Sequence, residues 1–559
     1  MSDKIPAPTP KEDLNFLIID NQGLVHDVIK TALAEIGIKR IASALNAYHA
    51  LRLCETLQFD FVLLAFNVSH DKDGFHLYEE LKHNRYITDK TTVIFLSAET
   101  SAELVNCIVE LQPDDFWVKP LDRKRIEGRL NYLIDIRRKL NKLLHCLHVG
   151  DYSAAIYYAE RKLKEKSVAE YHVRLRRIIG ECLMHLRDYE TAEKYYSRLL
   201  NNYDHAWVHI GRAKALLKQH KQEEADALID ELLTRRDTRF LTYDLLAQFF
   251  IEKEDFESAY AQMKEASRLA PRNIERNKRL WDLARLNHDK SGQLSAVQNM
   301  AKYAKNSIHD SPELTLNVIR SMLDLATSLN GAEAERITRR AESEIDGLVN
   351  RKGIGNQLAD QVEVLKARIY CLRNDKKSAE SIMKSKPPST DGFTMEDNLD
   401  KMKAFHELGM KEHCLSILEK LRKQIAGDTF SSQVVDEYLK QESIERREIS
   451  FTTNELKQMA TVNFKEGRYV PAYNNLRQAL TLAPKNKPVA LNLLKVLVQI
   501  RRQGALGHEQ QTIAQQAAML LMDEDLPATQ VQKRDEYLKL LGIELDATND
   551  DAVKKQVNP

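Results

Sequence analysis

The sequence has few cysteines, no excess of charge of one sign and no long apolar run. None of its six cysteines forms a C-x-x-C pair, so neither a disulfide framework nor a zinc knuckle is indicated. The balance of 83 basic and 82 acidic residues argues against nucleic-acid binding over a broadly basic surface. No stretch of about 18 apolar residues occurs, and residues 1–13 lack the apolar segment of a signal peptide. We therefore expect a cytoplasmic protein without a membrane anchor.

Motifs of common catalytic and output modules are also missing. The sequence contains no Gly-rich phosphate loop, no H-E-x-x-H and no G-x-S-x-G element. It also lacks a helix-turn-helix, a zinc finger, and GGDEF, EAL or kinase motifs. The pairs His145/His148 and His205/His209 have helical spacing that could suit a metal, but no third ligand accompanies either pair. We therefore expect no enzymatic activity, no cofactor and no metal site.

Residues 14–135 alternate between short apolar strands and amphipathic helices. At 559 residues the chain is long enough for two or more domains, and this alternation predicts that the first is an α/β domain with a parallel sheet. In such sheets the functional crevice lies outside the carboxyl ends of the strands. The expected strands are 14–19, 61–66, 93–96 and 116–118, and the expected helices are 25–33, 78–81 and 102–111.

The residues at these strand ends resemble the receiver domain of two-component response regulators. The resemblance covers residues 14–135 and implies a flavodoxin-like, five-stranded parallel sheet. In that family two acidic residues after the first strand help to bind Mg²⁺, an aspartate after the third accepts a phosphoryl group, and Ser or Thr and Lys-Pro follow the fourth and fifth. The positions that match the family are Asp20, Asn67, Ser97, Phe116 at the aromatic switch position, Lys119 and Pro120.

Two positions depart from the family pattern. Asn21 replaces the second acidic residue, and Ala65 stands where the family has its phosphoacceptor. A methyl group cannot accept a phosphoryl group, and the loss of two carboxylates removes most of the charge that a divalent ion requires. The sequence thus predicts a degenerate receiver, or pseudo-receiver, in which Lys119 either contacts Asp20 or turns to solvent. Asp71 or Asp73, later in the same loop, is the alternative acceptor.

Residues 122–148 are predicted to form one continuous connecting helix. Its apolar positions alternate by three and four, which suits either packing onto the receiver or a short coiled-coil contact in a homodimer. The basic residues between Arg123 and Lys142 favour a solvated face, with phosphate binding as the alternative. The apolar positions are Ile126, Leu130, Leu133, Leu140, Leu144 and Leu147.

Residues 141–305 carry a repeat. Its small residues are separated by 37, 33, 34 and 37 positions, and each of the last four is preceded by another small residue twelve positions earlier. This period indicates stacked helix pairs, which resemble tetratricopeptide repeats and present a groove for a peptide or a helix of a partner. The pattern weakens at the last member and at Ala225, where Trp207 and Gly211 are out of phase. The recurring residues are Ala155, Ala192, Ala225, Ala259 and Ala296.

The array is predicted to continue to residue 545. Degenerate helical repeats are expected over 306–440, and a C-terminal repeat region over 441–545. Residues 384–397 are expected to form a loop, and residues 1–13 and 546–559 to be flexible termini. The small pairs that support this assignment are Ala367 with Ala379, Met402 with Cys414, and Ala460 with Ala472.

The two resemblances together imply a bacterial signal-transduction adaptor. A non-phosphorylatable receiver would dock on a histidine kinase or another receiver, and the repeat array would hold a second protein. The alternatives are a phosphorylation-responsive regulator that uses a non-standard aspartate, and a nucleic-acid-associated regulator that uses the basic stretch 123–177.

Overall fold

The structure is a computed structural model, and the chain divides into two compact units. The first comprises Met1–Leu280 and Asn299–Asp310, and the second comprises Trp281–Gln298 and Ser311–Pro559. The structure describes residues 8–68, 72–88, 90–99, 101–329, 331–351, 357–386, 394–424, 430–448, 451, 453–484, 486–522 and 526–543. Asp71, the predicted tail 546–559, and parts of the predicted N-terminus and of the loop 384–397 lie outside these residues.

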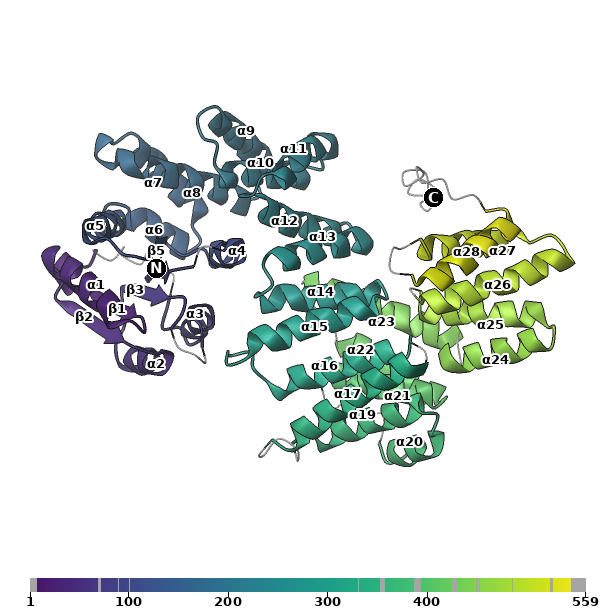
Figure 1. Ribbon diagram of the computed structural model, residues 1–559. Coiled ribbons are helices and arrows are strands. Elements are labelled where there is room, and N and C mark those ends of the chain that lie inside the picture. The colour runs from purple at the N-terminus through teal and green to yellow at the C-terminus, as the bar shows by residue number, and fades with distance from the viewer. Residues whose placement is uncertain are drawn as a thin grey trace. The chain divides into compact units, whose positions relative to one another are not determined.

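The first unit begins with a five-stranded parallel sheet in the order β2-β1-β3-β4-β5, as the predicted fold requires (Figure 1). The central strand β3 is buried along its whole length, which explains why its sequence is a continuous apolar run. Helix α1 packs against α5, and α2 against α3. The elements are β1 (Asn15–Ile19), α1 (Gly23–Glu35), β2 (Arg40–Ala44), α2 (Ala47–Thr56), β3 (Phe61–Ala65), α3 (Gly74–His83), β4 (Thr92–Ser97), α4 (Ala102–Leu111), β5 (Asp115–Val118) and α5 (Arg123–Lys139).

The predicted continuous helix over 122–148 is wrong, because it is two helices. Helix α5 ends at Lys139, Leu140 leaves the helical conformation, and α6 begins at Asn141. Ile126, Leu130 and Leu133 belong to the core of the receiver-like domain, whereas Leu140, Leu143 and Cys146 belong to the core of the first repeat. One apolar seam thus serves two cores. The seam is therefore used inside the chain rather than in a coiled coil.

Helical hairpins follow, and the small residues lie where their helices meet. Gly180 and Ala192 lie in α8 and α9, and Ala247 and Ala259 in α12 and α13; the three alanines are fully buried. The helices are α6 (Asn141–His148), α7 (Tyr152–Leu163), α8 (His172–His185), α9 (Tyr189–Leu200), α10 (Ala206–Lys218), α11 (Gln222–Thr234), α12 (Arg239–Glu252), α13 (Phe256–Leu269), α14 (Ile274–Leu286) and α15 (Lys290–Ala304).

The turn within these hairpins repeats one local geometry. Arg187 and Glu254 adopt positive φ values of 61° and 60°, and the aspartate that follows each caps the next helix. The Asp188 carboxylate accepts from the backbone N–H of Thr191 at 3.2 Å, and that of Asp255 from Ser258 at 3.1 Å. Such a cap contributes about 1 kcal/mol to a helix. The repeated turn sequence therefore fixes where each second helix begins.

Two glycines make room for one buried tyrosine. A Cβ at Gly180 would lie 2.6 Å from the Tyr196 ring, and a Cβ at Gly211 would overlap the same ring from α10. Tyr196 is buried with 2% of its surface exposed. Gly211 is thus out of phase with the small pair Ala213/Ala225 because it serves this contact.

The second unit continues the array with helices that are mainly paired in sequence order. Ala367 and Ala379, Met402 and Cys414, and Ala460 and Ala472 are buried within α19/α20, α21/α22 and α24/α25. The helices are α16 (Pro312–Ala326), α17 (Gly331–Val349), α19 (Ala359–Leu372), α20 (Lys376–Met383), α21 (Met395–Glu407), α22 (Lys411–Gln424), α23 (Phe430–Glu448), α24 (Thr453–Lys465), α25 (Tyr469–Leu482), α26 (Lys487–Gln503), α27 (His508–Leu520) and α28 (Ala528–Leu541).

Candidate functional site

The carboxyl ends of four strands bring the predicted receiver residues to one edge of the sheet. Ala65 ends β3 and pairs in register with Leu96, one residue before Ser97 at the end of β4. The backbone N–H of Lys119 donates to the carbonyl of Ser97 at 2.8 Å, which places the lysine beside that strand. Asp20 follows β1 and is completely buried.

Asp20 and Lys119 form an ion pair across this edge, as one of the two sequence alternatives predicts. The Lys119 Nζ lies 2.7 Å from Asp20 Oδ2, and the backbone N–H of Gln22 donates to Oδ1 at 2.9 Å. His26 Nε2 lies 2.8 Å from the Asp20 carbonyl oxygen. The single buried carboxylate is therefore already matched by a cation and by a backbone donor.

The residue at the phosphoacceptor position, Ala65, is buried, and its methyl group is unreactive. Ala65 is 1% exposed, and the N–H of Gly74 donates to the carbonyl of Phe66 at 2.5 Å. A Cβ at Gly74 would collide with the Ala65 carbonyl oxygen. The start of α3 thus lies directly against the end of β3, an approach that only glycine permits.

The remaining predicted residues make local contacts. The hydroxyl of Ser97 bonds the backbone N–H and carbonyl of Glu99, each at 3.0 Å. Phe116 is half-buried, whereas Asn21, Asn67 and Pro120 are exposed, and the Lys119–Pro120 bond is cis. Within the part of the chain that the structure describes, no group of three or more His, Cys, Asp or Glu side chains could hold a metal ion.

Asp73, the alternative acceptor, is held by two interactions. One carboxylate oxygen caps α3 by accepting from the His76 N–H at 3.0 Å, and the other accepts from the Arg272 guanidinium at 2.7 Å. Arg272 also lies over the rings of Phe66 and Tyr303, at 5.2 and 5.5 Å from their centroids. Arg272 of the repeat array therefore contacts Phe66 and Asp73, which lie between β3 and α3.

Helix α4 is tied to the same part of the array. The buried Arg276 pairs with Glu110 and Asp244, and its guanidinium lies 4.7 Å from the Phe240 ring centroid. Asn106 donates to the carbonyl of Leu269 at 3.2 Å. Sequence analysis missed these contacts, because isolated arginines in a helical repeat carry no signal of their intramolecular partners. Within the first unit, the receiver-like domain is fixed to the hairpin of α12 and α13.

Carboxylates of the chain neutralise part of the basic stretch 123–177. Six of its nine arginines pair with acids from several elements, which leaves less charge for a polyanion than the sequence suggests. The pairs are Arg123 with Glu35 and Glu127, Arg129 with Asp115, Arg137 with Asp60, Arg138 with Asp135, Arg174 with Asp114, and Arg177 with Glu181.

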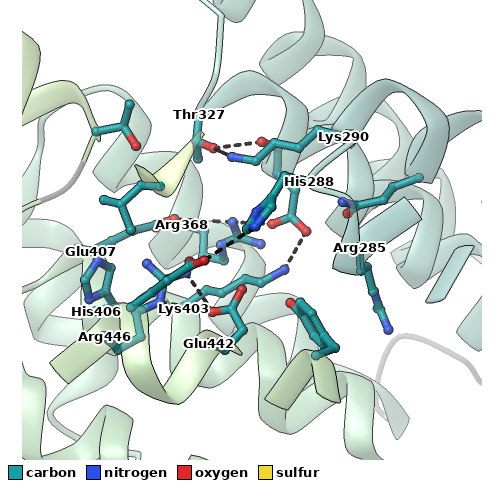
Figure 2. Close-up of a pocket in the computed structure, with 16 residues that line it drawn as sticks. Arg285, His288, Lys290, Thr327, Arg368, Lys403, His406, Glu407, Glu442 and Arg446 are labelled. Carbon is teal, nitrogen blue, oxygen red and sulfur yellow. Dashed lines mark hydrogen bonds and ion pairs between the residues drawn. The ribbon is translucent and has the colours of Figure 1, made fainter. Parts of the chain in front are cut away.

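The second unit contains a polar cavity of about 90 Å³ that sequence analysis did not predict (Figure 2). Five cationic and four carboxylate side chains from separate helices line it together with polar residues. These residues are spread over almost 200 positions, so no local motif indicates the cavity. The charged residues are Arg285, Lys290, Arg368, Lys403, Arg446, Asp324, Glu407, Glu442 and Glu445.

Burial alters the protonation of several of these groups. It lowers the pKa of His406 to about 3 and that of Lys290 to about 8. Burial and the charge of Glu442 raise the pKa of Glu445 to about 8. Burial also disfavours the Asp324 carboxylate, but Lys403 and Arg368 outweigh it and hold its pKa below the usual range. The cavity thus combines fixed ion pairs with groups that titrate near neutrality.

Comparison with known proteins gives one family match and several similar solved structures. The family model of the response regulator receiver domain matches residues 16–131. Similar solved structures include a yeast Spc42 trimeric coiled coil (amino acids 181–211) fused to another structure, with 18% identity over 29% of this chain and 97% of that chain and a TM-score of 0.22.

Two further structures cover more of this chain. The APC/C hetero-tetramer Cut9–Hcn1 has 15% identity over 77% of this chain and 98% of that chain, with a TM-score of 0.27. Naa15/Naa10 bound to HypK-THB has 14% identity over 67% and 69%, with a TM-score of 0.30. Among the described residues, no helix combines the length and apolarity needed to cross a bilayer. Residues 16–131 thus match the response regulator receiver domain, and an array of sequentially paired helices follows them.

Proposed function

We propose that the protein is a signalling adaptor whose receiver acts by contact instead of phosphoryl transfer. The observation that carries this proposal is the end of β3, where the buried methyl group of Ala65 occupies the acceptor position. The matched pair of Asp20 and Lys119 supports it, because a carboxylate already neutralised at 2.7 Å has little charge left for Mg²⁺.

The contacts of Asp73 argue against this residue as the acceptor in the phosphorylation-responsive alternative. To accept a phosphoryl group, its carboxylate would have to leave both the cap of α3 and the Arg272 guanidinium. Loss of a cap and of a charge-assisted hydrogen bond together costs roughly 2–4 kcal/mol. The adaptor function needs no such rearrangement.

The partner surface on the receiver is proposed to lie on its α1 and α2 side. Leu24, Leu45 and Tyr48 are 81%, 55% and 71% exposed, and they follow the carboxyl ends of the neighbouring strands β1 and β2. Helix α4 is not proposed as this surface, because its Glu110 already binds Arg276 and Asn273 of the array. A helix of a histidine kinase, or another receiver, fits an apolar patch of this kind. The repeats would then hold the second protein.

Exposure to a phosphoryl donor tests whether the receiver accepts a phosphoryl group. With acetyl phosphate and Mg²⁺, we expect intact-mass spectrometry to find no phosphoryl adduct on the full chain. Beryllofluoride with Mg²⁺ should likewise leave the fluorescence of Trp117, which is buried beside the site, unchanged. An acid-labile adduct on any aspartate of residues 14–135 would overturn the proposal.

Restoring the carboxylates tests the alignment on which the proposal depends. Ala65→Asp combined with Asn21→Asp should tighten Mg²⁺ binding by about tenfold or more, because unit charges about 4 Å apart interact by several kcal/mol at an effective dielectric near 20. Mg²⁺ titration followed by Trp117 fluorescence measures the change. The single variant Asn21→Asp is the matched control and should gain less. Unchanged affinity in the double variant would show that these positions do not form a receiver site.

A further inference from the structure

The hairpin of α14 and α15 departs from the repeat pattern at the cavity. In the hairpin of α8 and α9 the positive-φ residue Arg187 follows Gly180 by seven positions and precedes Ala192 by five. Counted in the same way from His288, which has a φ of 51°, the paired positions are Trp281 and Gln293. The small pair of this hairpin, Ala284 and Ala296, is thus shifted three positions along the chain, and Gln293 lines the cavity.

Most charges around this cavity are paired. Asp324 accepts from Arg368 at 2.8 Å and also pairs with Lys403, while Glu407 accepts from Arg368 at 3.2 Å. Figure 2 shows the pair of Arg446 and Glu442, whose closest atoms lie 2.9 Å apart. These contacts pair three of the four lining carboxylates with cations, although Oε2 of Glu407 is buried without a hydrogen-bond partner. Among the described residues, no group of three or more His, Cys, Asp or Glu side chains could hold a metal ion as the occupant.

Lys290 is the exception among the five cations. Its Nζ donates to the hydroxyl of Thr327 at 2.8 Å, and none of the described carboxylates lies within 4.0 Å of it (Figure 2). The Thr327 hydroxyl in turn donates to the carbonyl of Asp324 at 2.7 Å. An ammonium that is removed from water and has only a neutral partner is unfavourable by several kcal/mol. Lys290 is therefore one ammonium of the cavity that no described carboxylate pairs with directly.

Two further donors near the cavity have no acceptor. The Nε atoms of Arg285 and Arg368 are buried and unbonded, and these residues are 5% and 1% exposed. Buried polar groups are nearly always hydrogen-bonded, so such donors indicate a missing acceptor. Both belong to residues that line the same cavity as Lys290.

We propose that the cavity binds a small oxyanion, a phosphate or carboxylate group, with Lys290 as its principal ligand. A water molecule needs only about 10–15 Å³ of such a volume, so the cavity of about 90 Å³ has room for one phosphate or one short carboxylate. An anion there would pair the Lys290 ammonium and so link the stability of the second unit to the concentration of a small metabolite or ion.

Binding to the full chain tests this site. Inorganic phosphate and acetate are titrated separately against the wild-type protein by calorimetry, with thermal unfolding as a second measurement at constant ionic strength in chloride. We expect at least one anion to bind and to raise Tm. Phosphate binding without acetate binding would identify a phosphate-bearing ligand, and the reverse would identify a carboxylate. Absence of binding by both would overturn the proposal.

Substitution of Lys290 gives the second part of the test. Lys290→Met should weaken binding at least tenfold and leave the anion-free protein as stable as the wild type or more so, because it removes an unpaired charge. Lys290→Gln, which keeps a donor for Thr327, serves if the first variant does not fold. Lys423→Met, at an exposed lysine of the same unit, is the matched control and should bind as the wild type does. Unchanged binding in the Lys290 variants would overturn the assignment.

Discussion

The strand-end site of the receiver and the cavity of the second unit handle buried charge in opposite ways. At the strand ends one buried carboxylate faces one lysine at 2.7 Å, and a methyl group fills the place where the family has its reactive aspartate. In the cavity, five cations and four carboxylates crowd together and Lys290 remains unmatched. A site in which every charge is paired offers no free charge to a ligand. A site with an unpaired charge can bind a ligand of the opposite charge.

The largest effect should come from breaking the paired part of the cavity. Arg368→Leu would leave Asp324, Asp400 and Glu407 without their shared guanidinium in a site that is almost fully buried. Removal of one partner from a buried network costs about 3–5 kcal/mol. Urea denaturation of the full chain, followed by circular dichroism, should show that loss in the transition of the second unit.

The matched control for this variant is Arg339→Leu. Arg339 pairs with Glu335 on the surface of α17, with 73% of its side chain exposed, and exposed pairs contribute about 0–1 kcal/mol. Equal losses for the two variants would mean that burial does not set the strength of the cavity network.

A smaller loss is expected at the strand ends. Lys119→Met removes the cation that pairs with the buried Asp20, but the backbone N–H of Gln22 still donates to the carboxylate. We expect the free energy of unfolding to fall by about 1–3 kcal/mol, the cost of an incompletely satisfied buried acceptor. Lys39→Met, at an exposed lysine of the same domain, should change it by less than about 0.5 kcal/mol. A gain in stability would contradict the role assigned to this ion pair.

The sequence was informative wherever periodicity or strand order determines the geometry. Parallel strands bring their carboxyl ends to one edge, so the contact of Asp20 with Lys119 could be anticipated from four short segments. Strand β2 was not located, because Arg40–Ala44 forms a partly exposed edge strand in which Ile41 is the one large apolar side chain. The cavity and the contacts of Arg272 and Arg276 could not be anticipated, since they join side chains that only tertiary packing brings together.

The smallest predicted effect is the pH dependence of anion binding at Lys290. Burial lowers the pKa of Lys290 to about 8, in an environment that contains Asp324 and Thr327 from α16, Arg368 from α19, Lys403 from α21, and Glu442, Glu445 and Arg446 from α23, with His288 nearby. Because this folded-state pKa lies below the ordinary value of 10.5, the ammonium destabilises the anion-free protein fully below pH 8, and the penalty is relieved as the pH rises toward 10.5.

Anion affinity should fall as the pH rises, because Lys290 loses its positive charge. Phosphate and acetate keep constant charge between pH 8 and pH 9, while the charged fraction of Lys290 falls from about one half to about one tenth. The Glu445 carboxyl, whose pKa is also raised to about 8, gains negative charge over the same interval. Binding should therefore weaken by at least about fivefold, which calorimetry at the two pH values measures. A dissociation constant that stays constant from pH 8 to pH 10 would show that Lys290 is not the ligand. The cavity would then resemble the strand-end site, with its charges matched from within the chain.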